Sequence, residues 1–184
     1  MYSYSNPTER YPHGALGDRI EWASLIAISL YSDDRYLLRY DLAEDEVFEG
    51  LFPLVADVDG DGKEEIVTTV SRSGSGSRLV VFGHDSAGLR VIAESEPIGT
   101  GSRWLHQIAV APFGPDGEME IAVVRTPHIG GIAQYYRLVG DSVEEVWELE
   151  LGSRLASNLA VVETPGGSLI LGASTEDGQL LIWQ

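Results

Sequence analysis

Short strand-like runs recur along this chain at a spacing of about fifty residues, and this recurrence limits its fold more than any other feature. Gly101-Ser102-Arg103 returns as Gly152-Ser153-Arg154, and Asp61-Gly62 returns as Asp116-Gly117. A repeat of roughly 40–50 residues that holds four short strands is typical of a β-propeller blade. We therefore expect an all-β chain that forms a β-propeller of about four four-stranded blades.

The expected strands are short β-branched or aromatic runs that lie between clusters of Gly, Ser, Asp and Pro. No window longer than about ten residues shows a sustained helical period. Strands are expected at 52–57, 65–71, 78–83 and 89–95, then at 106–111, 120–125, 133–138 and 143–150, and finally at 158–162, 168–173 and 179–183. Upstream strands are expected at 21–30, 36–41 and 46–48, after a first strand within residues 8–18.

These spacings predict one domain over residues 1–184, with blades at about 8–50, 51–104, 105–154 and 155–184. A propeller ring closes in order to remove its edge strands. We expect the segment 2–10 to pair beside 179–183 and complete the last blade. The alternatives are an incomplete ring and closure by pairing with another chain.

Charge and composition exclude several classes of function. The formal net charge is −17, and an acidic surface repels phosphate, so nucleic acid is not an expected partner. Cysteine is absent, which excludes disulfides and thiol chemistry. The longest apolar stretch, 25–30, is far shorter than the ~20 residues that span a bilayer. We expect a soluble protein that does not cross a membrane.

The first seven residues contain neither a basic region nor an apolar region of a secretory signal. A mature chain after signal removal has the same appearance, and an acidic, cysteine-free chain suits the periplasm. We expect a secreted or periplasmic protein, with the cytoplasm as the open alternative.

The most specific motif is a nine-residue acidic loop between two expected strands. It has acidic residues at positions 1, 3, 5 and 9, and glycine at position 6, a pattern that surrounds one point with hard oxygen ligands. Like charges packed so closely repel unless a cation lies among them. We predict a calcium site rather than a magnesium site, because the loop offers more ligands than magnesium takes; the alternative is a solvated acidic hairpin. The predicted ligands are Asp57, Asp59, Asp61, Glu65 and the main-chain carbonyl of Lys63.

The stretch 53–67, which contains this loop, resembles the FG-GAP/VCBS repeat of integrin-like calcium-binding β-propellers. The segments 11–18 and 125–131 are also similar to bacterial VCBS-repeat proteins of unassigned function. The resemblance implies calcium stabilisation and a role in adhesion or scaffolding. Members of this family commonly have more than four blades.

The equivalent loop of the next blade, 112–120, keeps only two of the acidic positions, Asp116 and Glu120. Two carboxylates with Pro, Phe and Gly at the other positions are too few for calcium. In the last blade, the segment 163–167 has lost the motif. We therefore predict one metal site.

A second group of residues is expected on one face of the propeller, where the loop that enters a blade approaches the loop between its second and third strands. Trp and Arg side chains on such a face are suited to binding a protein partner or a glycan. The alternative is that Trp104 fills a blade junction and the histidines cap backbone groups. The residues of this predicted binding face are Arg103, Trp104, His106, His128 and Arg154.

Motifs of common hydrolases, zinc proteases and phosphate-binding loops are absent from the sequence. The acidic cluster of Asp41, Glu44, Asp45, Glu46 and Glu49 is interpreted as a solvated face. The pair Glu144-Glu145 is interpreted as a solvated turn or an edge-strand guard, with a hydrolytic pair as the alternative. We expect a non-catalytic calcium-binding module for protein interaction or scaffolding, as a subunit of a larger assembly or oligomer. The alternative is a carbohydrate-active enzyme, a lyase or hydrolase, that uses His106, His128 and Arg103.

Overall fold

The structure is a computed structural model that describes residues 1–14, 17–31, 34–101, 103–126, 132–150, 159–165, 167–173 and 180–183. In these ranges the chain is all-β, as predicted, and contains no helix that could cross a bilayer. The strands are β1 (Tyr2–Thr8), β2 (Glu21–Tyr31), β3 (Asp34–Asp41), β4 (Glu46–Phe48), β5 (Leu54–Ala56), β6 (Glu65–Arg72), β7 (Gly76–Asp85), β8 (Gly88–Glu94), β9 (Leu105–Pro112), β10 (Met119–Arg125), β11 (Ile132–Val139), β12 (Ser142–Glu150), β13 (Leu159–Thr164), β14 (Gly167–Ala173) and β15 (Leu180–Trp183). Every strand expected between residues 21 and 183 is present, with ends that differ by a few residues.

A strand is present in the expected segment 2–10, as β1 (Tyr2–Thr8), but its predicted partner is wrong. β1 pairs antiparallel with β2, and β15 is hydrogen-bonded to β14 in the other sheet. The separate first strand expected within residues 8–18 is wrong too, since the described residues between β1 and β2 contain no further strand. Burial explains the pairing with β2: the ring of Tyr4 packs in one apolar cluster with Leu25 and Ala27 of that strand.

The two central units are antiparallel meanders in which each strand pairs with the next along the chain. β5, β6, β7 and β8 form the first meander, and β9, β10, β11 and β12 form the second. The second meander has a register shift between Tyr135 and Tyr136, which leaves Val146 of β12 without a partner on β11. Such a β-bulge changes which side chains of a strand face each side of the sheet.

Short pairings join the units into one 12-stranded sheet. Its main path is β1-β2-β4-β6-β7-β8-β12-β11-β10-β9, and off this path β3 pairs with β2 and β5 pairs with β6. β4 bridges β2 and β6, and a single parallel pair, Ser142 opposite Glu94, joins β12 to β8. β13, β14 and β15 form a separate three-stranded sheet. In the part of the chain that the structure describes, the large sheet does not return to its starting strand. It is therefore open and does not confirm a propeller of four blades.

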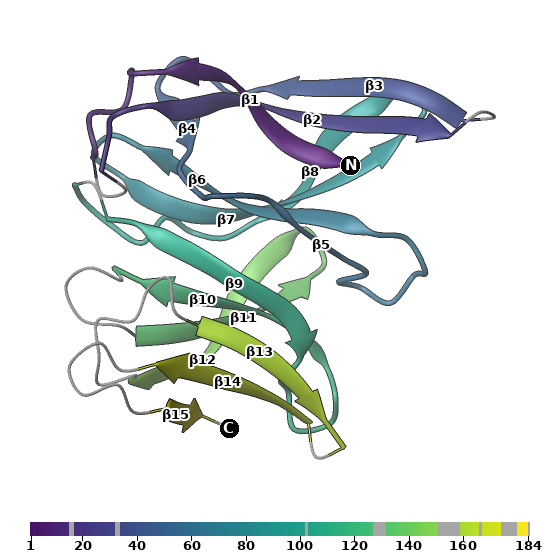
Figure 1. Cartoon of the computed structure of the whole chain (residues 1–184), viewed down its shortest axis with the longest axis vertical. Helices are drawn as coiled ribbons and strands as arrows, with labels where there is room; N and C mark the ends of the chain where they lie inside the picture. Colours follow the sequence, from purple (N-terminus) through teal and green to yellow (C-terminus); the bar gives the residue numbers. More distant parts are fainter. Residues whose placement is uncertain are drawn as a thin grey trace.

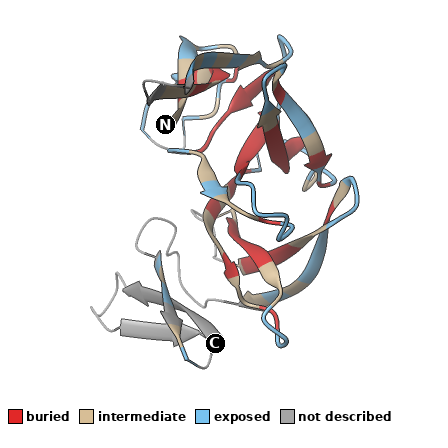
Figure 2. Cartoon of the chain, turned by 90° about the vertical axis from the view of Figure 1, so that its right-hand side faces the viewer, coloured by how far each residue is buried: buried red, intermediate tan, exposed pale blue. Residues whose placement is uncertain are grey.

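Successive units pack face to face, and the units follow one another along the long axis of the molecule (Figure 1). The alternating residues of β7 show how this works: Val80 and Phe82 face a cluster shared with β2, whereas Leu79 and Val81 face a cluster shared with β10. Both faces of the β5–β8 meander are therefore buried, and the buried positions concentrate on its inner strands (Figure 2). A third cluster lies on the other face of the β9–β12 meander, where Val161 of β13 packs against it.

Candidate metal centre and loop face

The acidic loop connects β5 to β6, as the sequence predicts. Its tight turn depends on two glycines, Gly60 with φ 78° and Gly62 with φ 87°. This left-handed conformation is readily adopted by glycine and strained for most other residues. The loop therefore doubles back on itself within a few residues and brings its alternating acidic residues to one side.

Asp57, Asp59 and Asp61 converge, because each offers a carboxylate oxygen that lies within 4.8 Å of the oxygens of the other two. Backbone N–H groups of the loop hold these carboxylates in place. Gly60 and Gly62 donate to the two oxygens of Asp57 at 2.7 and 3.0 Å. A convergent set of carboxylates with a pre-formed backbone is suited to binding a divalent cation.

The other two residues of the predicted ligand set, Lys63 and Glu65, make contacts of their own. The ammonium group of Lys63 forms an exposed ion pair with Asp61 at 2.9 Å, which lowers the pKa of Asp61. Glu65 is buried, and its Oε2 accepts a hydrogen bond from Val58 N at 2.9 Å. Its pKa is raised, first by burial and then by the charges of the three aspartates. Glu65 is thus within electrostatic reach of the cluster but outside the 4.8 Å set.

The donor chemistry of this loop fits calcium. Calcium prefers six to eight hard oxygen ligands at about 2.3–2.6 Å, and carboxylates and main-chain carbonyls are its usual protein ligands. Asp57, Asp59 and Asp61 supply such oxygens from three separate side chains. By spacing, the main-chain carbonyl of Lys63 and the carboxylate of Glu65 would complete the set.

The equivalent loop of the second meander has a different role for its acidic residues. Glu120 is fully buried, and its two oxygens accept hydrogen bonds from Arg137 at 2.6 Å and from Trp147 Nε1 at 2.9 Å. Asp116 lies in the turn, where its N–H donates to Glu118 Oε2 at 3.0 Å. Glu120 is therefore used as an internal hydrogen-bond acceptor that links β10 to β11 and β12.

A cavity of about 640 Å³ adjoins the acidic loop, and Asp59 and Asp61 line one side of it. Its other lining residues include Tyr2 of β1 and His84 of β7, which are joined by a hydrogen bond of 3.1 Å between Tyr2 Oη and His84 Nε2. Sequence reasoning missed these two residues because it did not place the N-terminal strand next to the loop.

The predicted binding face is only partly assembled in the described residues. His128 and Arg154 lie outside those ranges. Arg103 is exposed, but Trp104 is only 4% exposed and its ring lies 5.4 Å from that of His106. Trp104 therefore does not present its ring to solvent, which favours the blade-junction alternative for this side chain.

Trp104 and His106 have one further property in common. Trp104 Nε1 and His106 Nδ1 are buried, and neither has a hydrogen-bond partner among the described residues. Burial lowers the pKa of His106, so its neutral form is favoured. The alternative interpretation expected the histidines to cap backbone groups. Within the described residues, His106 does not do so through Nδ1.

The interpretation of residues 41–49 as a solvated acidic face is wrong for two members. Glu46 is buried and forms ion pairs with Arg72 at 3.1 Å and Arg78 at 3.0 Å. Glu49 is buried too and accepts hydrogen bonds from His13 and Ser71. The acidic pattern alone did not reveal these partners, because all of them come from distant strands and loops.

No protein-family model matches the chain, and no curated protein matches it in sequence.

Proposed function

We propose that this chain is a non-catalytic calcium-binding module of the β-propeller type that serves protein interaction or scaffolding. The observation that carries the proposal is the convergence of Asp57, Asp59 and Asp61 on a glycine-shaped loop between two strands. That loop also bears the resemblance to the FG-GAP/VCBS repeat, whose members are calcium-stabilised.

The propeller architecture of about four blades is part of this proposal. Its support is the succession of antiparallel meanders, β5–β8 followed by β9–β12 and then β13–β15, each packed on the next through a buried face. The large sheet is open. An open array exposes edge strands that a neighbouring chain can pair with, which favours a subunit of a larger assembly over an isolated ring.

Calcium would act here as a structural ligand. A cation among the three aspartates offsets their mutual repulsion and ties the loop ahead of β6 to a single conformation. β6 is central to the large sheet because it pairs with β4, β5 and β7. Holding its N-terminal end is therefore expected to stabilise the whole sheet.

The proposed location is secreted or periplasmic. The calcium sites of extracellular modules bind with dissociation constants of roughly 0.1–1 mM. Such a site is filled only where calcium is abundant. A secreted or periplasmic location fits that requirement.

The proposal is tested by calorimetric titration with calcium, together with melting curves in calcium and in chelator. A ligand that binds only the folded state adds about 2.7 kcal/mol of stability at a hundredfold excess over Kd. We expect heat of binding for one site and a lower melting temperature in chelator. Absence of both effects overturns the calcium proposal. Measuring the molar mass in solution in calcium and in chelator tests the assembly.

A further inference from the structure

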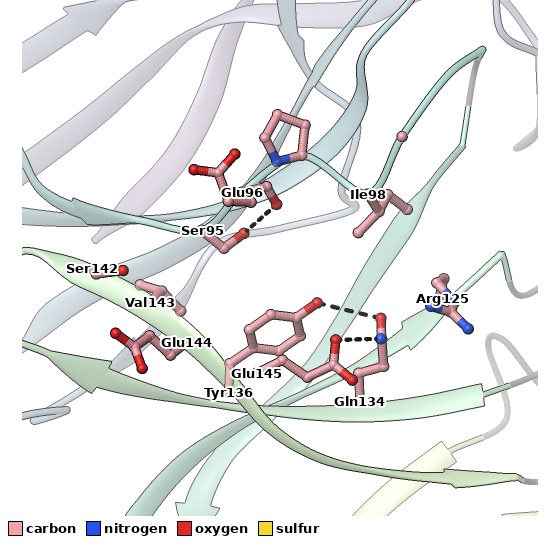
Figure 3. A pocket seen from close by; sticks show the side chains of 12 residues that line it. Ser95, Glu96, Ile98, Arg125, Gln134, Tyr136, Ser142, Val143, Glu144 and Glu145 are labelled. Carbon is pink, nitrogen blue, oxygen red and sulfur yellow. Dashed lines mark hydrogen bonds between the residues drawn. The ribbon is translucent and has the colours of Figure 1, made fainter.

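The contact between the β5–β8 and β9–β12 meanders shows how successive units of this chain pack on each other. Its centre is apolar, with Val81 of one unit and Ile121 of the next in one buried cluster. At its edge the two units separate around a cavity of about 590 Å³ (Figure 3). There Gln134 Nε2 donates to Glu145 Oε2 at 2.8 Å, and Tyr136 Oη donates to Gln134 Oε1 at 3.3 Å. A contact between units thus has an apolar centre and a polar rim, as interfaces between proteins do.

The sheet of β1, β2 and β3 stands at the N-terminal end of this succession of units, and one of its faces is covered. Alternate residues of β3 pack against the buried cluster that includes Val80 and Phe82 of β7; they are Tyr36, Leu38 and Tyr40. The residues between them are exposed; they are Arg35, Leu37 and Arg39. Because alternate residues of a strand face opposite sides of a sheet, the exposed set marks the outward face of the first unit.

This outward face is apolar at its centre. Leu37 is 69% exposed and lies opposite Ile28 of β2, and Ile26 lies opposite Arg39. Met1 is 73% exposed and exchanges main-chain hydrogen bonds with Ile28. Residues opposite each other in antiparallel strands share a face, so Ile26, Ile28 and Leu37 form one apolar patch. None of the three belongs to a buried hydrophobic cluster of the described residues.

The charge beside this patch favours an acidic partner. Arg35 and Arg39 flank Leu37 on the same face, and Arg39 pairs with Asp41 at 2.7 Å. Two arginines in one place stand out in a chain with 12 basic and 29 acidic residues. They reduce the repulsion that an acidic protein meets on docking, and a second copy of this chain, with a formal net charge of −17, is such a protein.

The other end of the succession is the sheet of β13, β14 and β15. Val161 of β13 packs against the β9–β12 meander. Its neighbours Ala160 and Val162 are exposed, and they lie on the opposite face of the strand. This outward face of the last unit corresponds to the face that each inner unit presents to its successor.

We propose that the outward face of the β1–β3 sheet packs on the outward face of the β13–β15 sheet of a second copy, head to tail. The inference rests on the assembly in the proposed function and names its partner and its surfaces. Within the chain, three buried clusters join each unit to the next. The contact between copies repeats that packing with the two end faces that the chain leaves uncovered among its described residues.

Head-to-tail contacts form a ring when the rotation from copy to copy closes. Two copies with about four units each supply about eight, which is within the roughly 4–8 blades of closed propellers. Sedimentation velocity of the full chain over a wide range of protein concentration measures the mass. We expect about twice the 20.0 kDa of one chain. The mass of a single chain at every concentration overturns the proposal, and so does a mass that exceeds two copies.

Variants of exposed residues test the two faces without disturbing the fold. Leu37→Glu places a charge on the first face and Val162→Glu on the last. We expect each to raise the dissociation constant of the pair by about tenfold or more, because a buried, unpaired charge opposes association. Val139→Glu is the matched control, since Val139 is 48% exposed at the end of β11 and outside both faces. An equal effect of the control overturns the proposal.

Mixing the two variants tests the head-to-tail arrangement. The Leu37→Glu copy keeps an intact last face, and the Val162→Glu copy keeps an intact first face. We therefore expect mixed dimers that form more tightly than the dimers of either variant alone. If like faces paired with like faces, mixing would restore no intact contact, so the absence of mixed dimers overturns the arrangement.

Each measurement is made in calcium and in chelator. The residues of the two faces lie outside the acidic loop 57–65. A single chain that still binds calcium therefore overturns this inference and leaves the calcium proposal standing. An assembly that survives both end-face variants overturns these surfaces and leaves the proposed assembly.

Discussion

Gln107 Oε1 accepts a hydrogen bond from Thr69 Oγ1 at 2.9 Å, and this contact joins the first strand of one meander to the second strand of the preceding one. The amide nitrogen of Gln107 donates to the main-chain carbonyl of Phe52 at 2.8 Å and to Tyr4 Oη at 3.3 Å. One buried side chain of β9 thus holds parts of β1 and β6 and the loop before β5. Gly50 leaves room for it, since a Cβ there would lie 2.5 Å from Gln107 Nε2.

Gln107→Leu is expected to destabilise the fold by about 1–3 kcal/mol, because it removes three hydrogen bonds and leaves the buried hydroxyl of Thr69 without this partner. The free energy of unfolding from denaturant titration measures this loss. Thr69→Val removes one of the partners. In the double variant the combined loss is expected to be smaller than the sum of the single losses, because the two residues share a bond. Strict additivity would contradict the coupling.

Asp59→Ala is expected to abolish the stabilisation by calcium, because it removes one of the three convergent carboxylates. Asp116→Ala is the matched control, since Asp116 occupies the equivalent loop of the next meander and is not part of the cluster. Melting curves in calcium and in chelator measure both. An equal loss of the calcium response in the two variants would show that the count of one site is wrong.

Trp104→Ala is expected to lower the free energy of unfolding by about 3–5 kcal/mol, because a buried indole leaves a large cavity. Arg103→Ala changes the exposed neighbour and is expected to cost less than about 0.5 kcal/mol. Denaturant titration compares the two variants. A small loss for Trp104→Ala, together with weakened binding of a partner, would restore the docking role that the sequence predicts for this residue.

The free energy of unfolding is expected to fall as pH rises through the range set by Glu21. Burial, and then the charges of Glu49 and Asp18, raise the pKa of Glu21 from 4.5 to about 8. Between these values the folded state binds the proton that the unfolded state has lost, so the contribution is complete below pH ~4.5 and is lost as pH rises through about 8.

The expected size of this effect is about 2 kcal/mol after allowance for partial solvent screening. Denaturant titrations between pH 5 and pH 9 measure it. Glu21→Gln keeps the shape of the side chain and is expected to flatten the profile. The slope that Glu49 contributes stays, since its pKa is raised by burial as well. An unchanged profile in Glu21→Gln would assign the pH dependence to other groups.

The acidic loop was predictable because its information is local. Gly60 and Gly62 set the turn, and the spacing of Asp57, Asp59 and Asp61 places their carboxylates on one side of it. The buried state of Glu49 was not predictable from its acidic neighbours. Its hydrogen-bond partners, His13 and Ser71, come from elsewhere in the chain and meet only in the folded structure.

Strand positions, turn positions and the acidic loop were determined by the sequence alone, because alternating side chains and glycine turns act over a few residues. Only the tertiary structure decided which strand pairs with β1, that Trp104 is buried, and where the cavity at Gln134 lies. β1 pairs with β2 because Tyr4 finds its apolar surroundings there. The cavity exists because two successive meanders separate where their facing side chains change from apolar to charged.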